Sequence, residues 1–198
     1  MALYQATPEL LGRFRTTVGE LGHITGPYRG RLYHWQTKKH SDIDEVMAAL
    51  WPWLGRAKRV QLHVATAGVG RSLPVACGTV GSPEAAPAWA AGFFDGEGFI
   101  GASVSGRRRS IRISIAQASA NGPPETLLRM RAALGTGRIR GPFRMASPWS
   151  KLPQYEWNAA SFEEVQHSVA LIWPWLGPVK RAQARSALVR YRHRSERS

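Results

Sequence analysis

The sequence predicts an α+β protein with one complete αββαββα unit built on an antiparallel sheet, preceded by a partial αββα copy of the same unit. Two observations carry this prediction. The segment Ser110-Ile111-Arg112-Ile113-Ser114-Ile115 alternates strictly, which places isoleucines on one face of a half-buried strand and polar side chains on the other. Helical patterns flank such strands, and much of the second half of the chain repeats the first.

The first half predicts helices on either side of two short strands. Thr7-Pro8-Glu9 has the cap, the proline and the acid of a helix start. Gly26-Pro27 is typical of a turn between strands, and Ser41-Asp42 of a helix cap. Pro52 should kink or break the helix that reaches it. The predicted elements are a helix over residues 9–21, strands over 23–25 and 32–36, and helices over 42–50 and 56–62.

The second half begins with the only complete unit. Residues 66–86 are rich in Gly, Pro, Ser and Ala and show no periodicity, which predicts a linker. A helix over 88–97 then leads into a strand over 99–105, and Gly106-Arg107-Arg108-Arg109 predicts a basic turn. The predicted domains are a partial repeat over 1–65, the linker over 66–86, a complete repeat over 87–190 and a basic, frayed tail over 191–198.

An internal duplication relates the two halves. Trp51-Pro52-Trp53-Leu54-Gly55 recurs as Trp173-Pro174-Trp175-Leu176-Gly177, and the offset is constant from Tyr33 to Gln61 without a gap. The helix with two acids and the strand pair after it are present only in the second copy. The first copy therefore corresponds to the latter part of the unit.

The composition favours an intracellular protein with a polyanionic partner. Lys and Arg total 27 against 13 acids, a net charge of +14, and nucleic acid is the commonest polyanion, although a merely basic surface is the alternative. One cysteine excludes an internal disulfide, and the six histidines form no i,i+4 metal pair. Neither a signal peptide nor a membrane span is expected, so we predict a soluble protein of the cytoplasm, nucleoid or organelle matrix.

The stretch over residues 88–100 is the most informative part of the chain. It starts as a helix of small and aromatic residues and ends in Asp95 and Glu97, separated by one glycine. Buried acids are costly unless they are paired or bind a cation. An ordinary acidic turn is the alternative. A calcium loop is excluded because Phe99 and Ile100 stand where further oxygen ligands would be required.

The run Ala90-Ala91-Gly92-Phe93-Phe94-Asp95-Gly96-Glu97-Gly98, with the strand pairs and the repeated Pro-Trp-Leu segment, resembles the LAGLIDADG homing endonucleases. The resemblance covers residues 87–190 as a complete unit and 7–65 as its latter half. It implies metal-dependent hydrolysis of phosphodiester bonds at a specific site in double-stranded DNA. It also implies that Glu97 binds Mg²⁺ with the carbonyl of Gly96, while Asp95 either braces the helix end or joins the metal.

The resemblance also assigns roles to residues outside the acidic run. Gln117, at the end of the alternating strand, would lie near the attacking water, although a buried core amide is the alternative. Lys180 would stabilise charge at the phosphate, and Lys58 is its repeat; a solvated helix lysine is the alternative. Gly92 and Gly96 form a face without side chains on which a second helix could pack about a two-fold axis.

The polar faces of the strands would contact DNA. An antiparallel ribbon fits the major groove, and its outward side chains reach base edges or phosphates. The tryptophans are assigned to packing. The predicted DNA-binding residues are Arg108, Ser110, Arg112, Ser114, Arg138, Arg140, Gln154 and Asn158.

A two-motif enzyme needs two acidic helices, and this chain supplies one. Three explanations stand. Two chains form a homodimer through the motif helix; or a first motif lies upstream of Met1; or cleavage is lost and the protein binds DNA, or intron RNA as a maturase.

Overall fold

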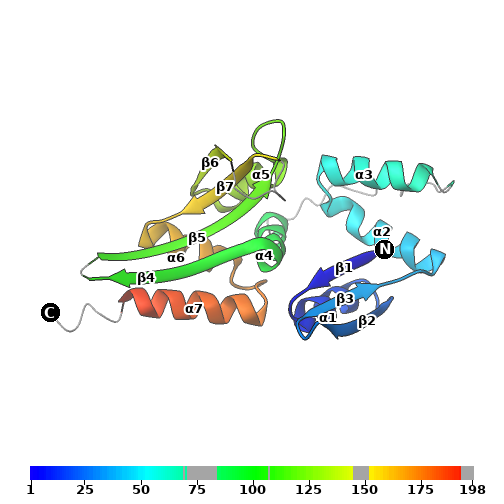
Figure 1. Ribbon diagram of the computed structural model, residues 1–198, viewed down its shortest axis with the longest axis horizontal. Helices are drawn as coiled ribbons and strands as arrows, with labels where there is room; N and C mark the ends of the chain where they lie inside the picture. The colour runs from blue at the N-terminus through cyan, green and yellow to red at the C-terminus, as the bar shows by residue number, and fades with distance from the viewer. Residues whose placement is uncertain (69, 71–83, 107, 145–151, 193–198) are drawn as a thin grey trace. The chain divides into compact units, whose positions relative to one another are not determined.

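The computed structural model describes residues 1–68, 70, 84–106, 108–144 and 152–192 (Figure 1). The chain divides into two compact units, an N-terminal unit (Met1–Gly81) and a C-terminal unit (Ser82–Ser198). Most of the predicted linker lies outside the described residues, between helix α3, which ends at Ala67, and helix α4, which begins at Ala85. None of the described helices is long and apolar enough to cross a membrane.

The C-terminal unit contains the predicted αββαββα order. Its elements are α4 (Ala85–Glu97), β4 (Gly98–Ser105), β5 (Arg108–Ala118), α5 (Glu125–Leu134), β6 (Arg138–Phe143), β7 (Gln154–Ala159), α6 (Phe162–Ile172) and α7 (Pro178–Arg192). The four strands are antiparallel in the order β4-β5-β7-β6. Helix α7 packs along β4 and β5.

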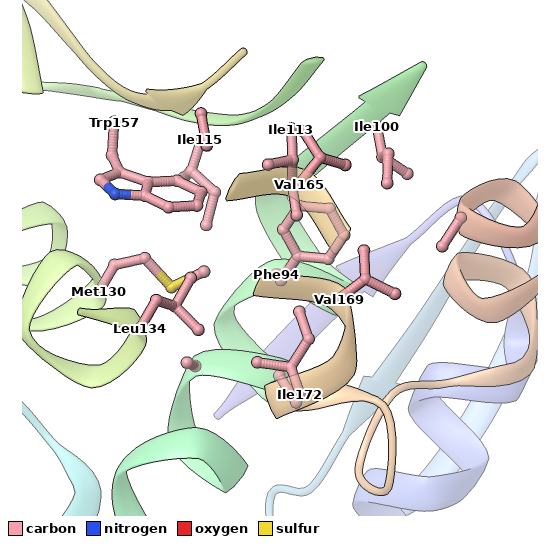
Figure 2. Close-up of a cluster of buried hydrophobic side chains, with 14 of the residues drawn as sticks. Phe94, Ile100, Ile113, Ile115, Met130, Leu134, Trp157, Val165, Val169 and Ile172 are labelled. Carbon is pink, nitrogen blue, oxygen red and sulfur yellow. The ribbon is translucent and has the colours of Figure 1, made fainter. Parts of the chain in front are cut away.

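The core of this unit lies between the sheet and helices α4, α5 and α6. Figure 2 shows the ring of Phe94 between Ile113 of β5 and Val165 and Val169 of α6. Phe94 and Ile113 are both fully buried, and the alternation of β5 predicts the burial of Ile113. Full burial of side chains of this size stabilises by about 1.5–3 kcal/mol each, so this layer fixes the position of α4 against the sheet.

The N-terminal unit is a smaller version of the same arrangement. Its elements are β1 (Ala2–Gln5), α1 (Pro8–Thr17), β2 (His23–Tyr28), β3 (Leu32–Gln36), α2 (His40–Leu50), the 3₁₀ turn η1 (Trp51–Trp53) and α3 (Arg56–Ala67). The three strands are antiparallel in the order β1-β3-β2. As predicted, the helix is interrupted at Pro52.

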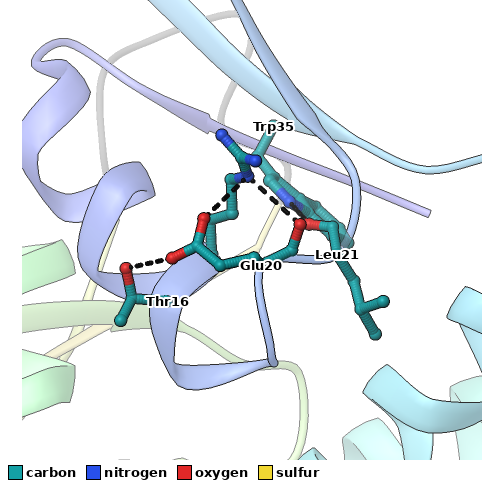
Figure 3. Close-up of polar contacts among 5 residues, drawn as sticks. Thr16, Glu20, Leu21 and Trp35 are labelled. Atoms are coloured by element: carbon teal, nitrogen blue, oxygen red, sulfur yellow. Dashed lines mark hydrogen bonds and ion pairs between the residues drawn. The ribbon is translucent and has the colours of Figure 1, made fainter.

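The same kind of hydrogen bond occurs inside each of the two units. The indole N–H of Trp35 donates to the carbonyl of Leu21 at 2.8 Å (Figure 3), and that of Trp157 donates to the carbonyl of Thr136 at 3.0 Å. Both tryptophans are fully buried at the centre of their cores, so each indole needs a partner. The duplication read from the sequence is therefore structural.

Strand β1 was not predicted. It pairs Gln5 with Tyr33 and Leu3 with Trp35, in the same register as β5 pairs Gln117 with Tyr155 and Ile115 with Trp157. Four residues are too few to show a period, which is why the sequence reading overlooked this strand. The first copy is thus β1 followed by αββα, and β1 corresponds to the end of β5.

The predicted turn at Gly26-Pro27 is wrong. These residues lie inside β2, at a register shift between Thr25 and Tyr28, where a proline is tolerated because the ladder is interrupted. The chain turns instead at Arg29 and Gly30, whose φ angles of 50° and 74° suit a tight hairpin. The amide of Arg31 closes this turn on the carbonyl of Tyr28 at 3.2 Å.

Other predicted boundaries shift by a few residues. Helix α1 ends at Thr17 because Gly19 and Glu20 have φ angles of 81° and 63°, and Figure 3 shows the Glu20 carboxylate accepting from Thr16 at 2.7 Å. Helix α2 starts at His40, strand β5 already at Arg108, and α7 runs on to Arg192. The tail is therefore helical as far as residue 192, and residues 193–198 lie outside the described part.

Candidate active site at the end of helix α4

The two acids at the end of α4 have opposite environments. Asp95 is 7% exposed, and its two oxygens accept from the backbone N–H of Gly177 at 2.8 and 3.0 Å. Gly177 stands directly before α7, where helix N–H groups lack internal partners and the helix dipole favours a negative charge. Glu97, the last residue of α4, is exposed. Asp95 therefore ties α4 to α7, and Glu97 is free to meet solvent or a ligand.

Lys180 lies at the same end of α4. From the first turn of α7 its Nζ donates to the carbonyl of Gly98, the residue after Glu97, and lies 5.5 Å from the ring centroid of Phe94. Burial lowers the pKa of Lys180, while the Asp95 carboxylate acts in the opposite direction. A partly desolvated ammonium group thus stands beside the carboxylate end of the helix.

Gly98 allows the close passage from helix to strand. A Cβ at this position would overlap the ring of Phe94. The chain can therefore turn from α4 directly into β4 across the buried ring only with glycine here. This contact places Glu97 at the junction of the helix and the sheet.

The side-chain-free face of α4 is open. Gly92 and Gly96 are exposed, and a Cβ at Gly92 would have no atom within 4 Å. Both residues lie one helical turn apart, so the backbone of another helix could approach closely here. Their role as a helix interface stays a prediction.

Two further predicted residues lie elsewhere. Gln117 is half-buried near the end of β5, on the same face as Ile113 and Ile115, as its parity predicts. Lys58 belongs to the N-terminal unit, where it is exposed on α3 and donates to Gln61 Oε1 at 3.0 Å. The structure thus gathers Asp95, Glu97 and Lys180 at one helix end.

The site offers oxygen ligands suited to half of a magnesium centre. Within the described residues no group of three or more His, Cys, Asp or Glu side chains could hold a metal ion. Mg²⁺ keeps several waters and is usually bound by one or two carboxylates together with substrate phosphates. The exposed Glu97 carboxylate and the carbonyl oxygens at the end of α4 fit such a partial site, because helix carbonyl ends attract cations.

The outward face of the C-terminal sheet carries most of the predicted DNA-binding residues. Arg108, Ser110, Arg112, Arg138 and Arg140 are exposed. Arg112 Nη1 lies 3.6 Å from Glu156 Oε1, and its Cζ lies 5.5 Å from the ring centroid of Phe99, so its guanidinium has partners on two neighbouring strands.

The other three predicted DNA-binding residues are less accessible. Gln154 is half-buried, and Ser114 and Asn158 are 4% and 5% exposed. Asn158 donates to Glu156 Oε2 at 3.0 Å. DNA contact by these residues stays a prediction.

Gln5 is a further polar residue of the same kind as Gln117, outside the predicted site residues. Its pairing with Tyr33 repeats the pairing of Gln117 with Tyr155, and both glutamines are half-buried. The signal was present, because Leu3-Tyr4-Gln5-Ala6 matches Ile115-Ala116-Gln117-Ala118 in pattern. The N-terminal unit thus retains counterparts of both Gln117 and Lys180, namely Gln5 and Lys58.

In the C-terminal unit an acidic helix runs directly into an antiparallel sheet, and the N-terminal unit repeats the later part of this arrangement. This is the fold of the LAGLIDADG homing endonucleases. Solved structures agree with this conclusion over most of the chain. I-GzeII in complex with its DNA target has a TM-score of 0.60 and 13% identity, covering 93% of this chain and 76% of that one. I-SmaMI bound to an uncleaved DNA target in the presence of calcium ions has a TM-score of 0.58 and 12% identity, covering 96% and 79%.

A shorter match is to I-CvuI in complex with its target, at 24% identity and a TM-score of 0.43. It covers 54% of this chain, which spans 65% of the length of I-CvuI, less than two-thirds. No protein-family model and no curated protein matches the sequence.

Proposed function

We propose that this chain is a site-specific double-stranded DNA endonuclease of the LAGLIDADG homing type that hydrolyses phosphodiester bonds with a divalent cation, Mg²⁺. The observation that carries the proposal is the division of roles at the end of α4. Asp95 is used to hold α7, while Glu97 is left exposed beside Lys180. The net charge of +14 and the arginine-rich outer face of the C-terminal sheet suit a DNA partner.

Each residue of the proposed site has a physical task. Glu97 and the carbonyl of Gly96 would hold the cation, with Asp95 bracing the helix end. When bound, the cation polarises a phosphoryl oxygen and lowers the pKa of an attacking water. The ammonium group of Lys180 would stabilise charge on the phosphate, and Gln117 would orient the water. Gln5 and Lys58 stand at the corresponding positions of the N-terminal unit.

A second carboxylate would come from a second copy of the chain. The exposed Gly92 and Gly96 give α4 a face on which a second α4 could pack, so that two Glu97 residues meet at one DNA site. Gly92→Leu would block this approach without disturbing the core. We expect the variant to sediment as a monomer on DNA where the wild type forms a dimer.

The test first selects bound sequences from a pool of random 24-base-pair duplexes and then incubates the selected duplex with protein in Mg²⁺ or Mn²⁺. We expect cleavage by the wild type, and its loss in Glu97→Gln with binding retained. Glu163→Gln, at an exposed acid of α6, is the matched control and should cut normally.

A binding protein of the same fold without cleavage is the alternative. It is favoured by the fact that, within the described residues, only one helix carries the acidic motif. Tight binding of the selected duplex without cleavage in either Mg²⁺ or Mn²⁺ would establish this alternative and refute the proposed endonuclease activity. Preference for a structured intron RNA over that duplex would indicate a maturase.

A further inference from the structure

A row of aromatic rings crosses the N-terminal sheet. Tyr4 on β1 pairs with His34 on β3, and Tyr28 on β2 pairs with Leu32, two residues before His34 on the same face of the sheet. The ring centroids of Tyr4 and His34 are 5.3 Å apart and tilted, and those of Tyr28 and His34 are 5.0 Å apart and stacked. We call these three residues the ring row.

Two of the three rings, those of Tyr28 and His34, are positioned by hydrogen bonds to one threonine. The hydroxyl of Tyr28 donates to Thr25 Oγ1 at 3.0 Å, and the same oxygen lies 3.1 Å from Nε2 of His34. A side chain held in this way loses little conformational freedom when it binds a partner, so less of the contact energy is lost to ordering.

The ring row faces away from the core. Its side chains lie on the face of the sheet opposite to that of Trp35, which is fully buried. Tyr4 and Tyr28 are 60% and 46% exposed. Exposed rings gathered on one face, rather than scattered singly, favour a contact site on this face.

The surroundings of the ring row suit a polyanion. The outward residues of this sheet, all within the described part, include no carboxylate: Ala2, Tyr4, His23, Thr25, Tyr28, Leu32, His34 and Gln36. The adjacent hairpin turn adds the exposed Arg29 and Arg31.

The duplicated sheet shows that the fold itself does not require these rings. The C-terminal sheet has Ala116 and Glu156 at the positions of Tyr4 and His34, and keeps one ring, Phe143, at the position of Tyr28. Glu156 accepts from Asn158 and pairs with Arg112, so that face is a charged network. The two faces therefore differ in the kind of contact they can make.

We infer that the ring row binds unpaired nucleobases of a single-stranded nucleic acid, with Tyr4 and Tyr28 stacking on bases and Arg29 and Arg31 contacting phosphates. Flat exposed rings match the π-faces of bases, which stacking hides in a duplex and exposes in a single strand. Base edges in a duplex groove would instead be read by hydrogen-bonding groups such as those of the C-terminal sheet. The inference is independent of Glu97 and of cleavage.

The test measures anisotropy of a labelled 20-nucleotide single strand, as RNA and as DNA, and of the DNA as a blunt duplex, over a salt series with the full chain. Stacking is worth about 1–3 kcal/mol per base, so we expect Tyr4→Leu and Tyr28→Leu each to weaken single-strand binding roughly 5- to 150-fold. Duplex binding should change by less than about twofold. Leucine keeps the apolar bulk of the side chain and removes only the flat ring.

Two controls separate stacking from other effects. Phe143→Leu removes the ring at the corresponding position of the other sheet and should leave single-strand binding unchanged. Tyr4→Phe and Tyr28→Phe keep the ring without the hydroxyl and should bind like the wild type. Circular dichroism checks that each variant is folded.

A cross-link adds a direct readout. A single strand containing 5-iodouracil should photo-cross-link to Tyr4 or Tyr28, as mapped by mass spectrometry. Unchanged single-strand affinity in both leucine variants overturns the inference. Equal losses on the duplex, or an equal loss in Phe143→Leu, also overturn it.

Discussion

Replacing Asp95 by alanine tests whether this acid is structural. The change would remove the acceptor of the Gly177 N–H, a buried donor at the start of α7. A hydrogen bond to a charged group contributes about 1.5–3 kcal/mol, and an unsatisfied buried donor costs a similar amount, so we expect a loss of about 2–3 kcal/mol. The carboxylate also faces Lys180, whose burial would then be less compensated.

Urea denaturation followed by far-ultraviolet circular dichroism measures this loss. With a urea dependence of about 1–3 kcal/mol per molar, the unfolding midpoint should fall by about 0.7–3 M. Asp95→Asn keeps a neutral acceptor and should lose roughly half as much. Hydrogen exchange should locate the destabilisation in the first turn of α7.

Glu97→Ala is the matched control, two residues further along the same helix. Because Glu97 is exposed at the carboxyl end of α4, where a negative charge faces the negative end of the helix dipole, its removal should leave stability unchanged or raise it by up to about 1 kcal/mol. Equal midpoints for Asp95→Ala and Glu97→Ala would refute the division of roles between the two acids. Such a result would also remove the main support for the exposed Glu97 carboxylate as the ligand of the proposed cation.

Three further changes test the packing that positions the site. Trp157→Phe removes the indole hydrogen bond to Thr136 and should cost about 1–3 kcal/mol, measured by urea denaturation; an unchanged midpoint would contradict the pairing. Gly98→Ala should destabilise by about 1–3 kcal/mol through overlap, whereas Gly92→Ala, in open space, should stabilise by about 0.4–1 kcal/mol; calorimetry giving the reverse order would disprove this assignment. Burial alone would raise the pKa of Glu164, but hydrogen bonds from Ser161 and Ala160 lower this pKa below that of an ordinary glutamate. Its contribution to stability is therefore present above the ordinary glutamate pKa and disappears as pH falls through the lowered pKa. Glu164→Gln should therefore weaken the decrease in the free energy of unfolding at acid pH, measured by urea denaturation over a pH series. An unchanged decrease would exclude this contribution.

The sequence predicted the C-terminal unit well because period and repeat agree there. The isoleucines of β5 and the recurring tryptophans each fix a buried face, and the duplication carries the assignment from one copy to the other. Strand β1 was overlooked because its four residues have no period. The first hairpin was misplaced because Gly26-Pro27 has the composition of a turn, while the positive φ angles fall at Arg29 and Gly30.

Other features depend on contacts that sequence order does not reveal. Asp95 and Glu97 are neighbours in the chain, and only the position of Gly177 determines which of them is buried. The ring row likewise joins residues of three strands, and its composition looks unremarkable when read along the chain. Side chains that act together across a sheet are visible only once the register is known.

The proposed cation would relieve an unfavourable placement of charge at Glu97. A carboxylate at the C-terminal end of a helix faces the negative end of the dipole, which costs about 0.3–1 kcal/mol when nothing compensates it. Within the described part of the chain the Glu97 carboxylate makes no hydrogen bond or ion pair. A divalent cation would relieve this repulsion and would use the same helix carbonyls as ligands. We therefore expect Mg²⁺ to stabilise the wild type more than Glu97→Gln, and most strongly when DNA phosphates complete the coordination.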